Sequence, residues 1–491
     1  MENPIQGPPP GTHAATDPHL AAGYSHGQGD GDVDLTIDRA QYKAETPLWK
    51  RIRQHSLTQM LFISVQAFCG PALSDAISGL GGGGLATPKT SNIRFALDQG
   101  VEAIVCLFGA VLVNFIGVKW SLVIGAASFP LLGASYYCNS QFNNQWFLIA
   151  TAPFTGTGFG FWNIAEGAYV MSIAPEAKRG KYLALWIVSR NAGQLVGGAI
   201  NLAKNAEKNS GGGIDPSTYI PFIVLEALAL PFAFGICEMK DVEMRYIVKT
   251  YLSKIIYCSF IFIIWSYFYN GPWSTYLALY FSVRARALSS LICPFFCIIG
   301  CFGLGYVTDL KGYSQRRRAQ FGFWLIIVLN VAVYVWSLIM QVRFVRNDPG
   351  PIDWSDKRFS EAFLPYFFIQ TTGPLAQVYT YWILSSFAES GQDNVRFSAA
   401  LKAIQCVGNA IAFGVSAADS SPLTGMILNC ALMVACIPGM WYITNKTPDR
   451  IPADVIAEEM ALEAEQRKKM EDPDKKDALE EVHTREVATL A

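Results

Sequence analysis

Twelve apolar stretches recur along this chain, each about twenty residues long and separated from the next by a short polar connection. A helix of about 20 apolar residues crosses the roughly 30 Å hydrocarbon core of a bilayer. The 491 residues are 51% hydrophobic and 16% charged, whereas about 25% of residues are charged in soluble domains. The sequence therefore predicts an all-α, polytopic protein with about twelve transmembrane helices, surrounded by the lipid bilayer.

The charged residues gather at the two ends of the chain and in one interval that follows the sixth stretch. This pattern divides the helices into two sets of six, which we expect to form two bundles. The expected segments are a disordered cytoplasmic tail over 1–55, a six-helix bundle over 56–237, a cytoplasmic interdomain loop over 238–254, a second six-helix bundle over 255–443 and a charged cytoplasmic tail over 444–491. The expected crossings lie near 56–79, 95–118, 120–138, 146–171, 182–202, 219–237, 255–281, 288–308, 320–341, 362–388, 396–416 and 424–443.

Basic residues favour a topology in which both tails lie in the cytoplasm, because Lys and Arg concentrate in cytoplasmic connections. The connections at 172–181, 238–254, 309–319 and 444–450 all carry basic residues and all fall on one side in this arrangement. The connection at 342–361 is also basic and falls on the other side, accompanied by acidic residues. We expect a multi-pass protein of the plasma membrane or of a vacuolar or other internal membrane, and the sequence leaves these locations open.

The fourth and fifth crossings carry one charged residue each inside otherwise apolar stretches, Glu166 and Arg190. A charge in hydrocarbon costs about 3 kcal/mol or more, so each needs a partner or a water-filled cavity. The hinge between these crossings is short, so we expect two antiparallel neighbours whose charged side chains meet. The pair either locks the two helices together or responds to protons or substrate, because breaking it changes the protonation of Glu166.

Asp98 and Glu102 lie one helical turn apart on the second crossing. Together with Asp75 they are expected near the outer mouth of the protein, where they either act as coupling carboxylates or are simply hydrated. The turn Gly81–Gly84 lacks the ending of a phosphate-binding loop and is expected to be flexible.

Lys402 and Gln405 lie on one stripe of the eleventh crossing together with Asn409. Lys402 either faces a cavity or extends its ammonium group to the membrane surface.

A short pattern repeats at equivalent places in the two halves, after the second and the eighth crossings. Each copy has a small residue, an Asp or Asn four positions later, a Gly three positions further and then a basic residue. The small residue allows close helix contact and the Gly turns the chain sharply, so we expect a latch that moves between conformations. The latch candidates are Asn114, Gly117 and Lys119 in the first half and Gly305, Asp309, Gly312 and Arg316 in the second half.

This repeat resembles the signature loop of the major facilitator superfamily, Gly-x-x-x-Asp-Arg/Lys-x-Gly-x-Arg/Lys, with departures that include Ala110 and Leu310. The segments IRFALDQGVEAIVCLFGAVLVNFIGVKW and WNIAEGAYVMSIAPEAKRGKY are similar to the fungal branch of the uncoordinated (Unc-ninety-three-like) family of that superfamily. The resemblance covers roughly 56–443. It implies a central cavity lined by the first, fourth, seventh and tenth helices, with a site near the midplane.

Polar and aromatic side chains dominate the helices that this resemblance places around the cavity, which suits a polar or amphipathic organic solute better than a bare metal ion. Further candidates lie on the fifth and eleventh crossings. The full set for the cavity or for coupling is Gln66, Asp98, Glu102, Asn163, Glu166, Arg190, Asn191, Gln194, Asn270, Trp273, Tyr276, Gln377, Tyr381, Lys402 and Gln405.

Other classes of function find little support. The chain lacks a Gly-x-Ser-x-Gly elbow, a His-Glu-x-x-His helix and a phosphate loop, so we expect no enzyme and no cofactor. All 11 cysteines lie in apolar stretches and are expected to pack as core residues rather than to bind metal. No basic face suggests a nucleic-acid partner.

Two hypotheses remain for the function. The first is a secondary transporter that moves a small solute by alternating access, with a proton as the candidate coupling ion. The second is a membrane scaffold that transports nothing and instead regulates or traffics a channel or receptor, as the resemblance also implies. This second hypothesis requires a membrane-protein partner.

Overall fold

The computed structural model describes Arg53 and residues 55–85, 87–173, 179–237, 254–308, 313–387, 391–418 and 421–448. The expected tails over 1–55 and 444–491 and the expected interdomain loop over 238–254 fall almost wholly outside these residues, so those expectations stay predictions. Within the described residues the regular structure is helical, and the one β-bridge joins Phe281 to Ile352.

The helices follow the expected order of crossings. Four of the crossings consist of two helices each, with breaks at Gly70, Thr151, Leu228 and Tyr269. The first half contains α3 (Ser56–Cys69), α4 (Pro71–Ser78), α5 (Pro88–Ile116), α6 (Val118–Phe142), α7 (Gln145–Ala150), α8 (Ala152–Ile173), α9 (Arg179–Asn205), α10 (Tyr219–Ala227) and α11 (Ala229–Gly235). The second half contains α13 (Lys254–Phe268), α14 (Asn270–Tyr280), α15 (Val283–Thr308), α16 (Gln315–Arg346), α17 (Phe359–Ser385), α18 (Gly391–Ala418) and α19 (Pro422–Lys446).

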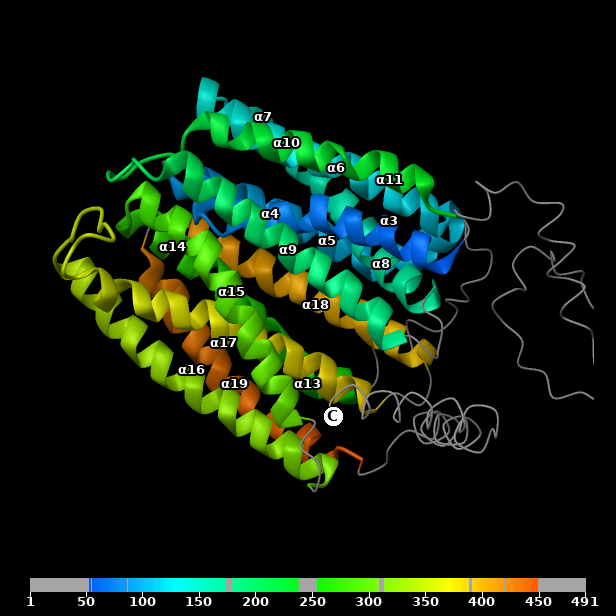
Figure 1. The fold of residues 1–491 in the computed structure, drawn as a ribbon. Coiled ribbons are helices and arrows are strands. Elements are labelled where there is room, and N and C mark those ends of the chain that lie inside the picture. Colours follow the sequence, from blue (N-terminus) through cyan, green and yellow to red (C-terminus); the bar gives the residue numbers. More distant parts are fainter. Residues whose placement is uncertain are drawn as a thin grey trace, which may run out of the picture.

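Seven helical segments in the described residues are long and apolar enough to cross a membrane by length and composition. They lie in α3/α4, α6, α10/α11, α15, α16, α18 and α19. Figure 1 shows the helices running roughly side by side, with the first half (α3–α11) above the second half (α13–α19). The prediction of an all-α, polytopic membrane protein is confirmed.

The two halves meet mainly through two pairs of helices, α5 with α18 and α9 with α15. We call the end of the molecule formed by connections 206–218 and 347–358 the loop end, and the opposite end, where α3 begins and α19 stops, the tail end (Figure 1). At the loop end the rings of Phe95 on α5 and Phe413 on α18 stack with centroids 4.9 Å apart. The halves are therefore in direct apolar contact at this end.

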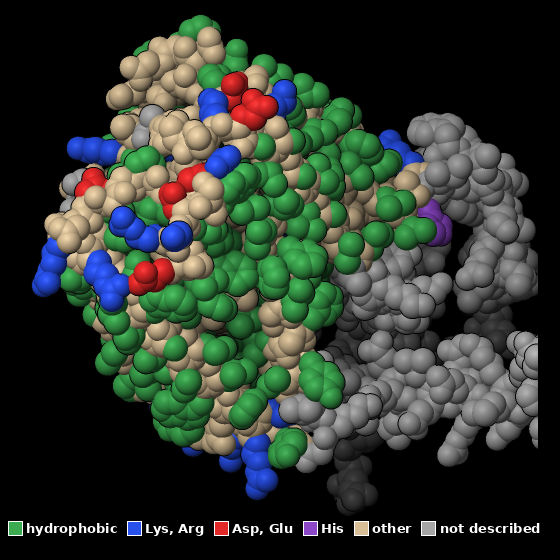
Figure 2. Space-filling view, turned by 60° about the vertical axis from the view of Figure 1, so that its left-hand side comes forward, with side chains coloured by type: hydrophobic (Ala, Val, Ile, Leu, Met, Phe, Trp, Pro, Cys, Tyr) green, Lys and Arg blue, Asp and Glu red, His purple; other side chains and the backbone are tan. Residues whose placement is uncertain are grey.

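The outer flanks of the helices remain apolar. Phe115, Phe302 and Tyr306 are 92%, 74% and 74% exposed, although each belongs to a long helix. Figure 2 shows hydrophobic side chains covering the flank, whereas Lys, Arg, Asp and Glu side chains gather over the loop end. Exposed apolar surface of this extent is suited to lipid rather than to water.

Candidate functional site

Arg190 forms its ion pair with a residue that differs from the expected one. Its Nη2 atom lies 3.3 Å from Oδ2 of Asp75 on α4, and Gln194, one turn further along α9, donates to the same oxygen at 2.9 Å. Glu166 accepts a hydrogen bond from Nε1 of Trp186 at 2.5 Å. The prediction of a direct Glu166–Arg190 pair was wrong, because α9 packs along α3 and α4 rather than mainly along α8.

Arg190, in the middle of α9, and its partner Asp75 on α4 both keep accessible side chains. The side chains of Asp75 and Arg190 are 44% and 32% exposed, whereas Glu166 is buried. Glu166 lies within electrostatic range of Arg190, Asp75 and Lys402. Tyr267 on α13 lies within range of Arg190, Lys402 and Tyr381. Both halves therefore turn ionisable side chains toward one centre. We call Asp75, Glu166, Arg190, Tyr267, Tyr381 and Lys402 the central cluster.

Glu102 joins the halves at the edge of this cluster. Its Oε1 atom lies 3.7 Å from Nζ of Lys402 on α18 and accepts from Nδ2 of Asn163 at 2.7 Å. Its Oε2 atom accepts from Nε2 of Gln99 at 2.6 Å, and Gln99 in turn accepts from Nδ2 of Asn409 at 3.1 Å. Lys402 is thus held inside by a carboxylate, and extension of its ammonium group to the membrane surface is not observed.

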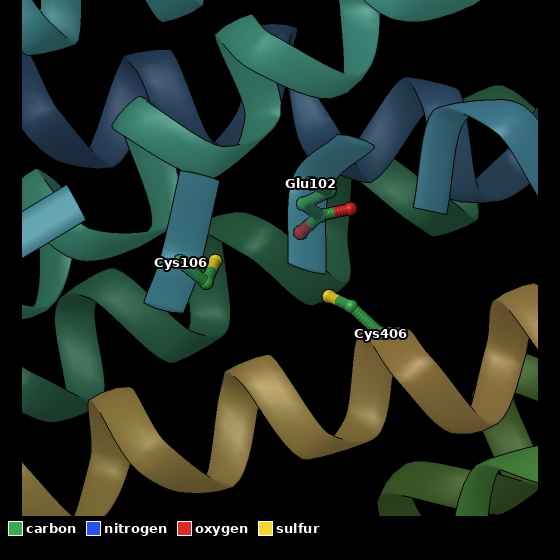
Figure 3. A group of neighbouring side chains, drawn as sticks. All are labelled: Glu102, Cys106 and Cys406. Atoms are coloured by element: carbon green, nitrogen blue, oxygen red, sulfur yellow. The ribbon is translucent and has the colours of Figure 1, made fainter. Parts of the chain in front are cut away.

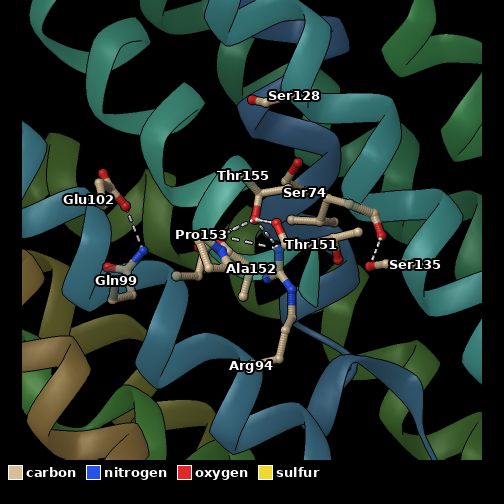
Figure 4. A network of polar contacts seen from close by, with 12 residues as sticks. Ser74, Arg94, Gln99, Glu102, Ser128, Ser135, Thr151, Ala152, Pro153 and Thr155 are labelled. Carbon is tan, nitrogen blue, oxygen red and sulfur yellow. Dashed lines mark hydrogen bonds and ion pairs between the residues drawn. The ribbon is translucent and has the colours of Figure 1, made fainter. Parts of the chain in front are cut away.

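Of the two alternatives for Asp98 and Glu102, simple hydration was wrong, and the coupling role stays a prediction. Asp98 and Glu102 are 3% and 2% exposed, and Asp75 pairs with Arg190 instead. Asp98 accepts from Thr155 and forms an ion pair with Arg94 at 3.3 Å. Figure 4 shows Arg94 reaching toward Thr155, which accepts from its Nη2 atom at 2.7 Å. Sequence reasoning missed Arg94, although its position four residues before Asp98 was the available signal.

Several other candidates are buried. Gln66, Trp273, Tyr276 and Gln405 are each at most 2% exposed. The hydroxyl of Tyr276 donates to the backbone carbonyl of Ala362 at 2.9 Å. The remaining candidates make local or bridging hydrogen bonds: Asn191 to the carbonyl of Ile187 at 3.0 Å, Gln377 to the carbonyl of Ser266 at 3.2 Å and Asn270 to Asn409 at 2.9 Å.

The loop end is closed by Arg286, a residue that sequence reasoning also missed. Its guanidinium is fully buried and donates to four backbone carbonyls of the first half. Nε reaches Leu80 and Nη2 reaches Gly81, both at 2.8 Å, while Nη1 reaches Gly212 at 2.8 Å. We call this arrangement the loop-end seal.

The turn Gly81–Gly84 belongs to this seal. All four glycines have positive φ angles, between 53° and 83°, a conformation that other residues adopt at a cost. The backbone N–H of Gly82 donates to Oγ of Ser274 at 2.9 Å, and Gly82–Gly84 is buried. The expected flexible turn is therefore a buried turn held by the second half.

The latch candidates are only partly described. Gly117 separates α5 from α6 with φ 93° and ψ 150°, as expected for a sharp turn. A Cβ atom built on Gly305 would have no atom within 4 Å, so the expected close helix contact is not made here. Arg318 donates to the carbonyl of Thr308 at 2.6 Å and so joins α16 to the end of α15. Asp309, Gly312 and the side chain of Asn114 lie outside the described residues, while Lys119 and Arg316 stay predictions.

Comparison with known proteins places this architecture in a family. A family model described as "Ion channel regulatory protein UNC-93" matches residues 93–277. Notoamide biosynthesis cluster protein O' of Aspergillus versicolor is 31% identical over 412 residues, which cover 80% of this chain and 89% of that protein. UNC93-like protein 1 of Arabidopsis thaliana is 24% identical over 425 residues, which cover 80% and 92% of the two chains.

A solved structure supports the same fold. The crystal structure of the D-xylose-proton symporter superposes with a TM-score of 0.56 at 15% identity and covers 80% of this chain and 98% of that one. The chain belongs to the UNC-93 family and has the all-α, polytopic fold of the major facilitator superfamily.

Proposed function

We propose that this protein is a secondary transporter that moves a small polar or amphipathic solute by alternating access between its two halves. One observation carries this proposal: Arg190, in the middle of the 27-residue α9, and its partner Asp75 on α4 keep 32% and 44% of their side chains accessible, while Arg286 closes the loop end. Charged side chains at this depth occur where they pair or face a water-filled cavity. A cavity that is open toward the tail end accounts for both features.

We assign the tail end to the cytoplasmic side, because Arg316, Arg317 and Arg318 at the start of α16 and Lys446 at the end of α19 lie there; in this assignment the conformation faces inward. The solute enters against Asp75, Arg190 and Gln194, which offer one carboxylate, one guanidinium and one amide. A guanidinium and a carboxylate side by side suit a solute that carries hydroxyl, carboxylate or amine groups. Tyr267 and Tyr381 add aromatic faces from the second half, and Tyr381 is 40% exposed.

Glu166 is the candidate proton carrier. It is buried, it accepts from Trp186, and the charges of Arg190 and Lys402 both act on it. Protonation of Glu166 removes one negative charge from the surroundings of Arg190. An anionic group of the solute then binds more favourably beside Arg190. The D-xylose-proton symporter shares the fold, and its name identifies the proton as the first coupling ion to test.

The alternative is a scaffold that regulates another membrane protein. The description of the matching family model, an ion channel regulatory protein, favours it. The accessible ion pair at the centre favours transport, because a scaffold has no need for charged groups at that depth.

The test is uptake into sealed proteoliposomes under an imposed pH gradient, with a panel of radiolabelled sugars, amino acids and small organic acids. We expect gradient-dependent uptake of at least one solute, and we expect Glu166→Gln to reduce it by tenfold or more. Arg190→Gln should weaken solute binding, because it removes the guanidinium and leaves Asp75 with Gln194 alone. The matched control is Arg343→Gln, which removes an exposed pair with Glu361 at the loop end and should leave uptake unchanged.

The outcomes separate the two hypotheses. Uptake that responds to Arg190→Gln and not to Glu166→Gln would retain transport and remove the proton-carrier assignment. No uptake of any solute by protein that is monodisperse and unfolds cooperatively would favour the scaffold.

A further inference from the structure

The contact between α5 and α18 brings two pairs of reactive side chains face to face. Glu102 and Cys106 lie one turn apart on α5, and Lys402 and Cys406 lie one turn apart on α18. The carboxylate of Glu102 and the sulfurs of Cys106 and Cys406 all lie within 4.8 Å of one another. Figure 3 shows the three side chains converging between the two helices. They form one cluster with contributions from both halves of the protein.

The donor atoms select a class of ligand. Two thiols and one carboxylate suit Zn²⁺ and related thiophilic ions, whereas Mg²⁺ and Ca²⁺ prefer oxygen ligands alone. Thiolates about 2.3 Å from a tetrahedral Zn²⁺ lie about 3.8 Å apart. The observed separations are up to about an ångström longer, a difference that side-chain rotation can close.

The surrounding charges also suit a divalent ion. Coordination requires each thiol to lose its proton, so the bound state holds two thiolates, the Glu102 carboxylate, the Lys402 ammonium and the ion. These charges sum to zero with Zn²⁺, and a neutral assembly is favoured in a buried site. The three ligands are at most 2% exposed, while the Lys402 side chain beside them is 26% exposed. Lys402 therefore marks an approach from the central cluster.

We propose that Glu102, Cys106 and Cys406 form a binding site for a thiophilic divalent metal ion, of which Zn²⁺ is the best match to these ligands. Three protein ligands leave the fourth tetrahedral position to water, as in exchangeable sites. Because the ligands come from α5 and α18, the bound ion ties the two halves together and stabilises the conformation in which these helices touch. This site is separate from the solute site and does not depend on transport.

Metal binding to the purified, reduced full-length chain tests this site. We expect one Zn²⁺ per chain by calorimetric titration and an ultraviolet charge-transfer band of a cadmium–thiolate bond when Cd²⁺ is added. Cys106→Ser and Cys406→Ser should each abolish high-affinity binding and diminish the band. Glu102→Gln should keep the band and weaken binding by at least the roughly 10–100-fold seen for loss of an outer-shell partner. The matched control is Cys436→Ser, which changes a buried free cysteine in α19 and should bind as wild type does.

A second measurement uses the wild-type chain alone and avoids any variant that fails to fold. Saturating Zn²⁺ should slow alkylation of Cys106 and Cys406 by tenfold or more relative to Cys436, as read by peptide mass spectrometry. The proposal is overturned if wild-type protein shows no cadmium–thiolate band, if Cys106→Ser/Cys406→Ser binds as wild type does, or if Zn²⁺ protects neither cysteine.

Discussion

Two arginines show how differently the two regions of this protein treat the same side chain. Arg286 in the loop-end seal is fully buried and donates to four backbone carbonyls. Arg190 in the central cluster is 32% exposed and pairs with one carboxylate at 3.3 Å. Backbone carbonyls are held by the helices and turns around them, so a seal made from them has one geometry. A pair of accessible side chains can exchange one partner for a solute.

The loop-end seal is built for rigidity, and the central cluster is built for exchange of partners. The seal uses a planar fork of five N–H donors, which matches several acceptors at once. The central cluster uses single charged contacts that water can reach, and such contacts contribute little to stability. We therefore expect substitutions in the seal to change the stability and closure of the protein, and those in the cluster to change what it binds.

Arg286→Ala should have the largest effect. Hydrogen bonds to charged groups contribute roughly 1.5–3 kcal/mol each, and four carbonyls lose their donor, so we expect the free energy of unfolding to fall by about 3 kcal/mol or more. Deuterium exchange of the backbone amides of 80–92 should rise sharply, because the loop end opens. The matched control is Arg284→Ala, two residues away, whose partner Asp353 lies in a surface connection.

If Arg284→Ala and Arg286→Ala raise exchange over 80–92 equally, the seal does not rest on the carbonyl contacts of Arg286. Arg286→Lys sharpens the same point, because it keeps the charge and removes the fork. We expect it to restore only part of the protection.

Gly198→Ala should have an intermediate effect on the loop end. A Cβ atom there would lie 2.5 Å from the carbonyl oxygen of Ser290 and 2.7 Å from Cα of Leu291. Both atoms are backbone of α15, so α9 and α15 must separate. We expect a lower Tm and faster exchange at the loop end, with a smaller change than for Arg286→Ala.

Gly100→Ala is the control for this substitution, since a Cβ atom at Gly100 meets nothing within 4 Å. Alanine in a helix interior is about 0.8–1.0 kcal/mol more favourable than glycine, so this variant should be neutral or slightly more stable. A Gly198→Ala variant as stable as Gly100→Ala would show that the α9–α15 contact yields easily.

Asp353 should have the smallest effect, and one that depends on pH. The guanidinium of Arg284 donates to both carboxylate oxygens, with Nε at 2.7 Å, and holds the pKa of Asp353 well below its ordinary value. Burial raises this pKa by less than Arg284 lowers it. The hydroxyls of Ser355 and Ser282 lower it further. A lowered pKa in the folded state contributes stability above the unfolded pKa of about 3.9, and this contribution is lost as pH falls further.

The measurement is Tm against pH for wild type and Asp353→Asn. We expect a constant difference between about pH 5 and 7, which narrows below about pH 4 as wild type loses its advantage. A difference that stays constant down to pH 3 would contradict this assignment. It would show that the ionised form of Asp353 does not carry the difference in stability.

The sequence by itself determined the helices and their order. About twenty apolar residues can cross a bilayer only as a helix, because every backbone N–H and C=O must be paired within the segment. The turn at Gly117 was equally visible, since it depends on local backbone chemistry. The candidate charges Glu166, Arg190, Glu102 and Lys402 also stood out against their apolar surroundings.

Only the tertiary structure decided which of these side chains meet. Arg190 pairs with Asp75, because the rotation and packing of α9 along α4 select its partner. Cys106 and Cys406 lie 300 positions apart (406 minus 106) and meet only because α5 packs on α18. The role of Arg286 depends on carbonyls of the other half, and backbone groups carry no sequence signal. Local segments are determined by their own composition, whereas contacts between segments depend on the packing of the whole chain.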